Sequence, residues 1–247
     1  MNTMKRMISE YFPEASDRIY FLCGVFMLST EIWKQLLLTF SVGAGRYNLW
    51  YLPFQLCSMP MYVLLAYPWF RREKIRRALL CFLMCYCLLG GTAAFADTSG
   101  MHYAVPALTV HSYLWHVLLI LIGIGSGILY ARKYAGFPEI RGKILFSRRL
   151  ASSLHARPFL HATALYLICC GIAEILNLAL DPYGNINMFY INPDYEMRQV
   201  VFCRLVPLLG NGGAILLYIA ATVLGAFLLF LLWHAVTGIL FQRRRRG

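Results

Sequence analysis

The sequence predicts an all-α, polytopic membrane helix bundle of about six transmembrane helices, and three observations lead to this prediction. Of the 247 residues, 60% are hydrophobic and only 14% are charged, whereas a soluble domain carries roughly 25% charged residues. The apolar residues fall in blocks of about 20, the length at which a helix crosses the hydrocarbon layer. The Lys and Arg residues, which outnumber the acidic residues to give a net charge of +12, concentrate in every second segment between the blocks.

The predicted spans follow one another without a second domain or an internal repeat. They cover residues 19–42, 51–70, 78–96, 107–131, 158–180 and 210–241. Each of the first five matches the roughly 17–25 residues that a transmembrane helix needs. The last one is long enough to tilt or to run past the membrane surface.

The basic residues orient the predicted bundle. Most of the 23 Lys and Arg lie in residues 1–18, 71–77, 132–157 and 242–247. Because basic loops stay cytoplasmic, six spans with both termini inside satisfy the rule at every loop. Residues 1–18 then form a cytoplasmic N-terminal segment, residues 19–241 a single transmembrane bundle, and residues 242–247 a basic cytoplasmic tail.

The charge distribution also bears on partners. We expect the basic loops to contact anionic lipid headgroups and place the protein in the cell membrane as a multi-pass protein. Binding of nucleic acid is not expected, because no basic stretch is interleaved with the exposed aromatic residues that a strand-binding groove uses.

The first span carries polar side chains on one face of its helix. Glu31, Lys34 and Gln35 stand at i, i+3 and i+4, which places them side by side. An ionisable residue inside a span costs several kcal/mol unless it has a partner, and is therefore a candidate for function. We expect Glu31 and Lys34 to pair with each other, and an ion pair of purely structural role is the alternative to a functional one.

The second span places Gln55 and Cys57 between two prolines. Pro53 falls in the predicted first helical turn, where proline is tolerated. Pro60 lies deeper, where it removes a backbone donor, and we expect it to kink the helix beside Cys57 and to expose polar backbone there. The alternative is an ordinary proline kink whose neighbours satisfy the freed backbone groups.

The third span and the fourth carry small residues. The cysteines of CysxxxCysxCys at 81–87 are predicted to be buried apolar residues, because no matching CxxC pair accompanies them. We therefore predict no metal site and no cofactor. In the fourth span, Gly123 and Gly127 stand one turn apart, a spacing that lets two helices approach closely.

The fourth and fifth spans also carry polar residues. His111 and His116 come early in the fourth span, where each is either a hydrogen-bonded packing residue or a proton carrier. Glu174 and Asn177 share one face of the fifth span. With both termini inside, all these residues fall on the outer side of the midplane, as do those of the first two spans. The sequence therefore predicts one buried polar pocket shared by four spans.

The external loop at 181–209 contains Asp-Pro and Asn-Pro pairs that signal turns, together with Met, Phe and Tyr residues that are unusually apolar for a loop in water. We expect it to fold back onto the outer mouth of the bundle and to bring Asn187 and Tyr190 to the pocket. The alternative is a loop lying on the membrane surface with its aromatic residues at headgroup depth.

A Cys, a His and a carboxylate in one shielded layer suit nucleophilic acyl transfer. The thiolate attacks a carbonyl, an imidazole takes its proton and a third group orients the imidazole. An apolar bundle keeps water from competing for the acyl-enzyme. Cys57 is then the candidate nucleophile, and the histidines of the fourth span are candidate bases.

Four short motifs resemble those of the YwaF-like bacterial integral membrane proteins. They are EIWKQ at 31–35, LPFQLC at 52–57, HSYLWH at 111–116 and NINMFYIN at 185–192. Members of the family carry a Glu and a Lys in one span, a Leu-Pro-x-His-x-Cys motif in the next, a later His and an Asn-Tyr-Met-Tyr-like segment. The family is similar to the eukaryotic transmembrane-protein-164 acyltransferases, which use a Cys and a His to move fatty acyl chains between phospholipids.

The resemblance covers about residues 20 to 200 and implies a phospholipid acyltransferase or acyl hydrolase whose partners are membrane lipids. It implies Cys57 as the nucleophile and His116 as the base, with His111 as second choice. Gln55 stands where the family usually has His, and the additional N-terminal span common in the family is not expected here. The candidate substrate-binding residues are Glu31, Lys34, Gln35, Gln55, Glu174, Asn177, Asn187 and Tyr190.

Two other classes of function stay open on the sequence. One is a small-molecule transporter or receptor whose polar layer binds a ligand, although the internal repeat typical of secondary transporters is missing. The other is a non-catalytic structural or assembly protein. The sequence also leaves the oligomeric state open.

Overall fold

The computed structural model describes residues 14–134 and 156–244, and within these ranges the chain forms helices and no strands. Five helical segments are long and apolar enough to cross a membrane: Ala15–Val42, Glu73–Ala93, Pro106–Tyr134, Arg157–Tyr183 and Phe202–Thr237. The predicted fold class, a polytopic helical bundle, is therefore confirmed. The N-terminal residues before 14, most of the basic loop at 132–157 and the end of the tail lie outside the described residues.

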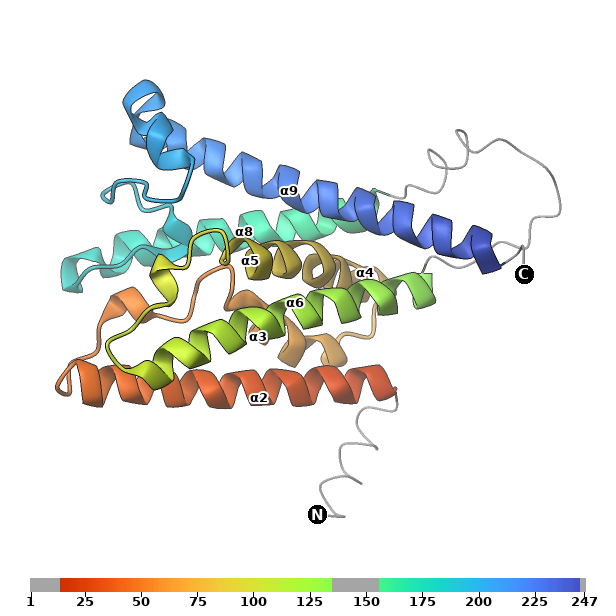
Figure 1. Cartoon of the computed structure of the whole chain (residues 1–247), viewed down its shortest axis with the longest axis horizontal. Coiled ribbons are helices and arrows are strands. Elements are labelled where there is room, and N and C mark those ends of the chain that lie inside the picture. Colours follow the sequence, from red (N-terminus) through yellow and green to blue (C-terminus); the bar gives the residue numbers. More distant parts are fainter. Residues whose placement is uncertain (1–13, 135–155, 245–247) are drawn as a thin grey trace, which may run out of the picture.

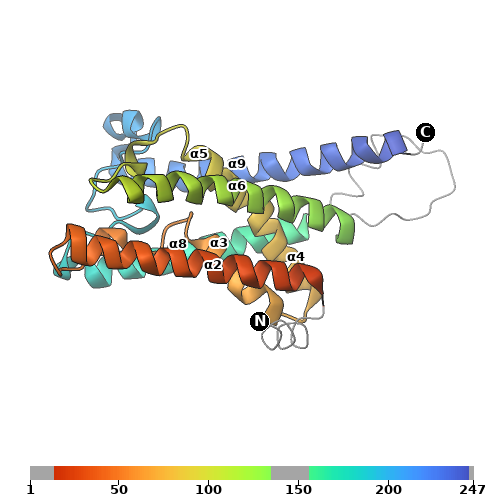
Figure 2. The same cartoon turned by 60° about the horizontal axis from the view of Figure 1, so that its bottom comes forward.

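The long helices lie side by side (Figure 1). They are α2 (Ala15–Leu37), continued by a π-helical turn at Leu38–Val42; α4 (Glu73–Phe82), joined by a π-helical turn at Leu83–Cys87 to α5 (Leu88–Ala93); α6 (Pro106–Tyr134); α8 (Arg157–Leu180), continued by Asp181–Tyr183; and α9 (Val206–Arg244). The loops after α2, after α5 and after α8 gather at one end of the bundle (Figure 2).

The predicted second span at 51–70 is not a continuous helix, and this prediction is wrong. The chain instead forms a 3-10 turn at Leu49–Tyr51, an irregular stretch, the short helix α3 (Met59–Ala66) and a further 3-10 turn at Tyr67–Trp69. Pro60 stands in the first turn of α3, where its missing N–H breaks no helical bond. The expected kink beside Cys57 is thus a helix start, and Cys57 itself lies before the helix.

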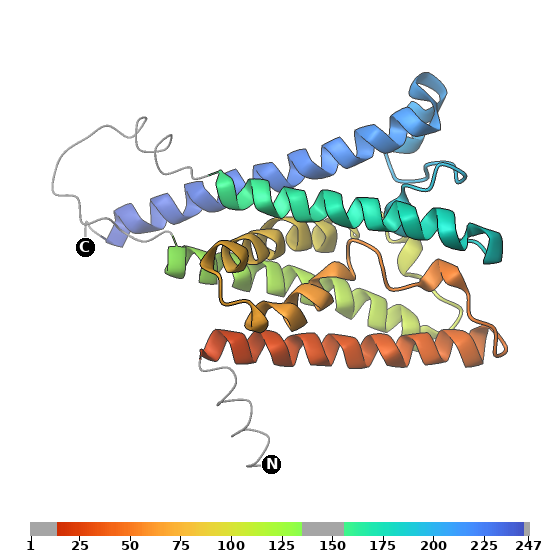
Figure 3. The same cartoon turned by 180° about the vertical axis from the view of Figure 1, so that it is seen from behind.

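The segment nevertheless returns across the bundle. Figure 3 shows the irregular stretch running between α2 and α8 toward α3. Arg76, near the start of α4, reaches Asp17, near the start of α2, with 2.6 Å between Nη2 and Oδ1. Helices α2 and α4 therefore begin at the same end of the bundle, and residues 43–72 supply the crossing between them.

A charged cluster holds that end together. Arg76 donates to both carboxylate oxygens of Asp17, and its guanidinium lies over the Tyr67 ring, 4.3 Å from the centroid. Lys133 of α6 pairs with Glu14, and this hydrogen bond is the main cause that lowers the pKa of the Glu14 carboxyl. The cluster ties α2, α4 and α6 together where they begin or end.

The segment Glu73–Ala93 is the central one, because 67% of its apolar window is buried, against 22–44% for the others. Small residues let its neighbours approach. A Cβ added to Gly123 would lie 2.7 Å from the Leu88 Cβ, and one added to Gly127 would overlap the Trp233 indole. The predicted packing role of the glycine pair is confirmed: Gly123 faces α5, and Gly127 makes room for α9.

Candidate functional site

The polar residues of α2 form a buried ion pair with an amide beside it. Lys34 Nζ lies 2.7 Å from Glu31 Oε1, and the Gln35 amide donates to the same oxygen at 2.6 Å. The Glu31 side chain is only 3% exposed and that of Lys34 is 16% exposed. The expected pairing of Glu31 with Lys34 is confirmed, and both charges are neutralised inside the bundle.

Cys57 lies on the irregular stretch that precedes α3, and two hydrogen bonds fix this stretch between α2 and α6. Gln35 donates to the carbonyl of Tyr51 at 2.7 Å, and the Trp115 indole donates to the carbonyl of Cys57 at 3.0 Å. Non-helical backbone at membrane depth is tolerated only where protein or a cavity surrounds it. The side chains of α2 and α6 supply that surrounding here.

The loop after α8 folds back into the bundle, as expected. Phe189 N–H donates to Gln55 Oε1 at 2.7 Å, and the Gln55 amide donates to the carbonyl of Asn187 at 2.8 Å. On the other side, Asn177 accepts from Met188 N–H at 2.6 Å and donates to the carbonyl of the same residue at 3.3 Å. The side-chain amides of Gln55 and Asn177 thus bind the backbone of the loop from opposite sides.

These hydrogen bonds hold the loop in a strained backbone conformation. Phe189 and Tyr190 both have positive φ angles, 56° and 57°, which cost about 1–3 kcal/mol for a residue other than glycine. Phe189 is buried and packs against Tyr166 and Phe54. Strain of this kind persists where the surroundings over-determine it, and such places cluster at functional sites.

The surroundings of the Cys57 thiol come from several elements. The charges of Lys34 and Glu31 act on it. Three tyrosine hydroxyls from separate parts of the chain are also its electrostatic neighbours: Tyr103, Tyr190 and Tyr218. Helix α2, the loop before α6, the loop after α8 and α9 therefore all contribute polar groups around one thiol.

The two histidines of α6 differ in their surroundings. His116 donates Nδ1–H to the carbonyl of Ser112, 2.8 Å away, and its ring meets Phe95 edge-on. The His111 ring lies between Trp33 and Trp115, with centroids 5.6 and 5.5 Å away, and its Nε2 is buried without a hydrogen-bond partner. The charges of both Lys34 and Glu31 act on His111, whereas Lys34 alone of the two acts on His116.

The predicted residues thus divide into two sets. Glu31, Lys34 and Tyr190 interact electrostatically with Cys57, whereas His111 and His116 interact with Lys34. Gln55, Asn177 and Asn187 bind loop backbone, and Glu174 lies 3.4 Å from the Asn177 amide. Gln35 belongs to both sets, because it joins the ion pair to the backbone of the second crossing.

Several residues around the site were not predicted from the sequence. Trp115 lies within the HSYLWH motif and Tyr103 resembles an ordinary membrane aromatic, yet Trp115 donates to the Cys57 carbonyl and Tyr103 interacts electrostatically with Cys57. Asn192 and Asn211 hold the returning loop through five hydrogen bonds between them and its backbone. Asn192 ends the NINMFYIN motif and Asn211 lies near the start of α9, so a polar amide beside apolar residues is the clue that could have marked them.

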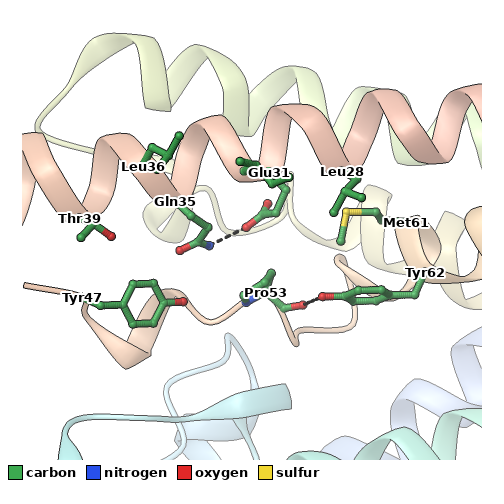
Figure 4. Close-up of a pocket in the computed structure, with 10 residues that line it drawn as sticks. Leu28, Glu31, Gln35, Leu36, Thr39, Tyr47, Pro53, Met61 and Tyr62 are labelled. Carbon is green, nitrogen blue, oxygen red and sulfur yellow. Dashed lines mark hydrogen bonds between the residues drawn. The ribbon is translucent and has the colours of Figure 1, made fainter.

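A groove opens beside the ion pair, between α2 and the segment that follows it (Figure 4). Its volume is about 250 Å³. The lining residues are Leu28, Glu31, Ile32, Gln35, Leu36, Thr39, Tyr47, Pro53, Met61 and Tyr62. Glu31 therefore belongs both to the groove and to the charged surroundings of Cys57.

Over residues 14–134 and 156–244, no three His, Cys, Asp or Glu side chains gather closely enough to hold a metal ion. No family model matches the chain, and neither the curated proteins nor the solved structures compared with it include a match. The chemistry of the site therefore has to be argued from its own residues.

Proposed function

We propose that the protein is an integral membrane enzyme that transfers acyl chains of membrane lipids through a thioester on Cys57. The observation that carries the proposal is the position of Cys57: its thiol lies on non-helical backbone between α2 and α6, and the charges of the Lys34–Glu31 ion pair act both on this thiol and on the His111 imidazole, whose Nε2 has no hydrogen-bond partner. A buried nucleophile needs a nearby cation or base to form a thiolate, and these two groups are candidates for both roles. The resemblance of the LPFQLC motif supports the same thiol.

The reaction has two balanced halves. In the first, the Cys57 S–H proton passes to an imidazole nitrogen and the sulfur attacks the ester carbonyl carbon of a lipid. The ester C–O bond breaks, and the departing alcohol oxygen takes the proton from the imidazolium. In the second, an acceptor hydroxyl, or water, gives its proton to the imidazole and attacks the thioester carbonyl carbon. The C–S bond breaks, and the departing thiolate takes the proton from the imidazolium to restore the thiol.

His111 fits the role of this imidazole better than His116. Its Nε2 is buried without a hydrogen-bond partner, and its ring lies beside Trp33 and Trp115. His116 donates Nδ1–H to a backbone carbonyl, which leaves its Nε2 as an acceptor, but of the ion pair only Lys34 acts on it. His111 also shares the Glu31–Lys34 neighbourhood with Cys57. We therefore assign His111 as the base in the proposed reaction and keep His116 as the comparison.

The test is trapping of the acyl-enzyme. The purified full-length chain is incubated in liposomes with a phospholipid whose acyl chain ends in an alkyne, and the adduct is detected after coupling to a fluorophore. We expect a hydroxylamine-sensitive adduct on Cys57 that the C57A variant lacks. The His111→Gln variant should form it at least tenfold more slowly, which corresponds to about 1.4 kcal/mol in the barrier.

Matched variants separate chemistry from folding. Cys87→Ala removes another buried thiol, one that lies near Cys57, and should keep the adduct. His116→Gln should change its rate less than His111→Gln does. An adduct of undiminished yield on C57A would remove Cys57 as nucleophile, and a larger loss with His116→Gln would move the base to that residue.

A further inference from the structure

The groove beside the ion pair opens toward the surface that faces lipid. Ile32 and Leu36 on its α2 wall are 51% and 53% exposed, and Tyr62 on the opposite wall is 39% exposed. Apart from its polar floor, the lining is apolar. A molecule dissolved in the bilayer can therefore enter from the side, without passing through water.

The floor of the groove is electrically neutral and offers one unused acceptor. Glu31 Oε1 accepts from both Lys34 and Gln35, so the carboxylate and the ammonium neutralise each other. The amide nitrogen of Gln35 donates hydrogen bonds to Glu31 and to the Tyr51 carbonyl. Its Oε1 is buried and has no hydrogen-bond partner.

A buried acceptor without a partner is unfavourable, so a ligand that donates a hydrogen bond there is stabilised by removing this cost. Figure 4 shows the Gln35 amide and the Glu31 carboxylate pointing from α2 into the space opposite Tyr47 and Pro53. A charged headgroup gains nothing at this floor, because both charges are already paired and a further charge at this depth is costly.

The volume limits the ligand to one chain. An apolar cavity of about 150 Å³ holds benzene, with its six carbon atoms. In the same proportion, the groove of about 250 Å³ has room for about ten carbon atoms. A single alkyl chain fits, and a second chain or a bulky headgroup does not.

We propose that this groove binds an uncharged single-chain lipid that bears a hydroxyl group, a fatty alcohol, with about ten carbon atoms of its chain inside the groove. The hydroxyl donates to Gln35 Oε1, and the chain lies along Leu28, Leu36 and Met61. Because this binding uses neither the thiol nor the imidazole of the proposed reaction, it stands or falls separately from that reaction.

The test is photolabelling of the full-length chain in lipid nanodiscs. The probe is a long-chain alcohol with a diazirine in its chain and a terminal alkyne, and the matched control probe is the same chain without the hydroxyl. We expect the alcohol to label peptides of residues 28–39 and 53–62 at least fivefold more strongly than the hydrocarbon does. Excess unlabelled alcohol should compete, and the labelling should persist in the C57A variant.

Two variants test the groove itself. Gln35→Leu removes the acceptor and should abolish the preference for the alcohol over the hydrocarbon. Leu36→Trp fills the groove from its α2 wall and should reduce labelling by the alcohol, whereas Leu178→Trp, at a site on α8 that is 60% exposed, should not. Thermal unfolding of each variant shows whether it is folded, so Leu36→Trp still decides the matter if Gln35→Leu does not fold.

Three results would overturn the proposal. They are equal labelling by the alcohol and the hydrocarbon, labelling spread evenly over the lipid-facing helices, and competition by a charged single-chain lipid such as lysophosphatidylcholine that is stronger than competition by the alcohol. Loss of acyl transfer in C57A with labelling retained would separate this site from the proposed reaction.

Discussion

At the scale of single residues, the amides of this protein act as clamps on backbone. Asn177 is fully buried and satisfies both the N–H and the carbonyl of Met188. Gln55 does the same for two neighbours of Met188 from the other side. Together they fix a loop in which two residues have positive φ angles, and so they place Tyr190 near the thiol.

Asn177→Leu should therefore destabilise the protein by about 2 kcal/mol, because two backbone groups of Met188 lose their buried partners. The measurement is thermal or denaturant unfolding in detergent. Asn185→Ala, an exposed position in the same loop, is the matched control and should change stability by less than about 0.5 kcal/mol. A loss no larger than that of the control would show that the clamp contributes little.

The sequence predicts contacts between residues of one helix more clearly than contacts between distant segments. The pairing of Glu31 with Lys34 follows from their spacing on one helix and could be predicted. The hydrogen bond from Trp115 to the Cys57 carbonyl joins residues 58 positions apart, and no local pattern announces it. For that reason Cys57 could be picked out in the sequence, but the hydrogen-bond partner of its carbonyl could not.

At the scale of elements, the second crossing differs most from its prediction. Hydropathy alone makes residues 51–70 a helix, since every stretch of that apolarity must satisfy its backbone within the membrane. Here side chains satisfy part of this backbone by hydrogen bonds. Gln35 of α2 donates to the carbonyl of Tyr51, Trp115 of α6 donates to that of Cys57, and Tyr62 of α3 donates to that of Pro53. Pro60 then lies at a helix start, rather than in a kinked helix, and Pro53 lies in the irregular stretch before it.

Close packing of α6 against its neighbours requires glycine where another helix approaches, and Gly127 and Gly125 of α6 offer a matched comparison. Gly127→Ala places a methyl group against the Trp233 indole, which donates to the Met84 carbonyl of the central helix. Overpacking of this kind costs about 1–3 kcal/mol. Gly125 faces open space, so Gly125→Ala should be neutral or stabilise the helix by up to about 1 kcal/mol.

Unfolding of the two variants in the same detergent is the measurement. Equal stability for both variants would show that α6 and α9 do not pack closely at Gly127. A selective loss in Gly127→Ala would support the contact between α6, α9 and the π-helical turn at Leu83–Cys87.

At the scale of the whole molecule, the direction of each crossing follows from the basic loops and can be tested directly. In a Cys203→Ser background, which removes the exposed native cysteine, a membrane-impermeant maleimide should label Tyr183→Cys on intact cells. It should label Lys74→Cys only after the membrane is permeabilised. The side chain at position 183 is 82% exposed, so poor access cannot explain a negative result, and the reverse pattern would invert the proposed topology.

The sequence by itself determined that this chain is a polytopic membrane bundle and where the five long spans lie, and it predicts the direction in which the basic loops orient them. These properties follow from apolar length and charge, which are local and additive along the chain. Only the tertiary structure decided that the second crossing is largely non-helical, that Gln55 meets a loop 134 residues away, and that a groove opens beside Glu31. These depend on hydrogen bonds and packing between distant segments, whose register no local pattern contains.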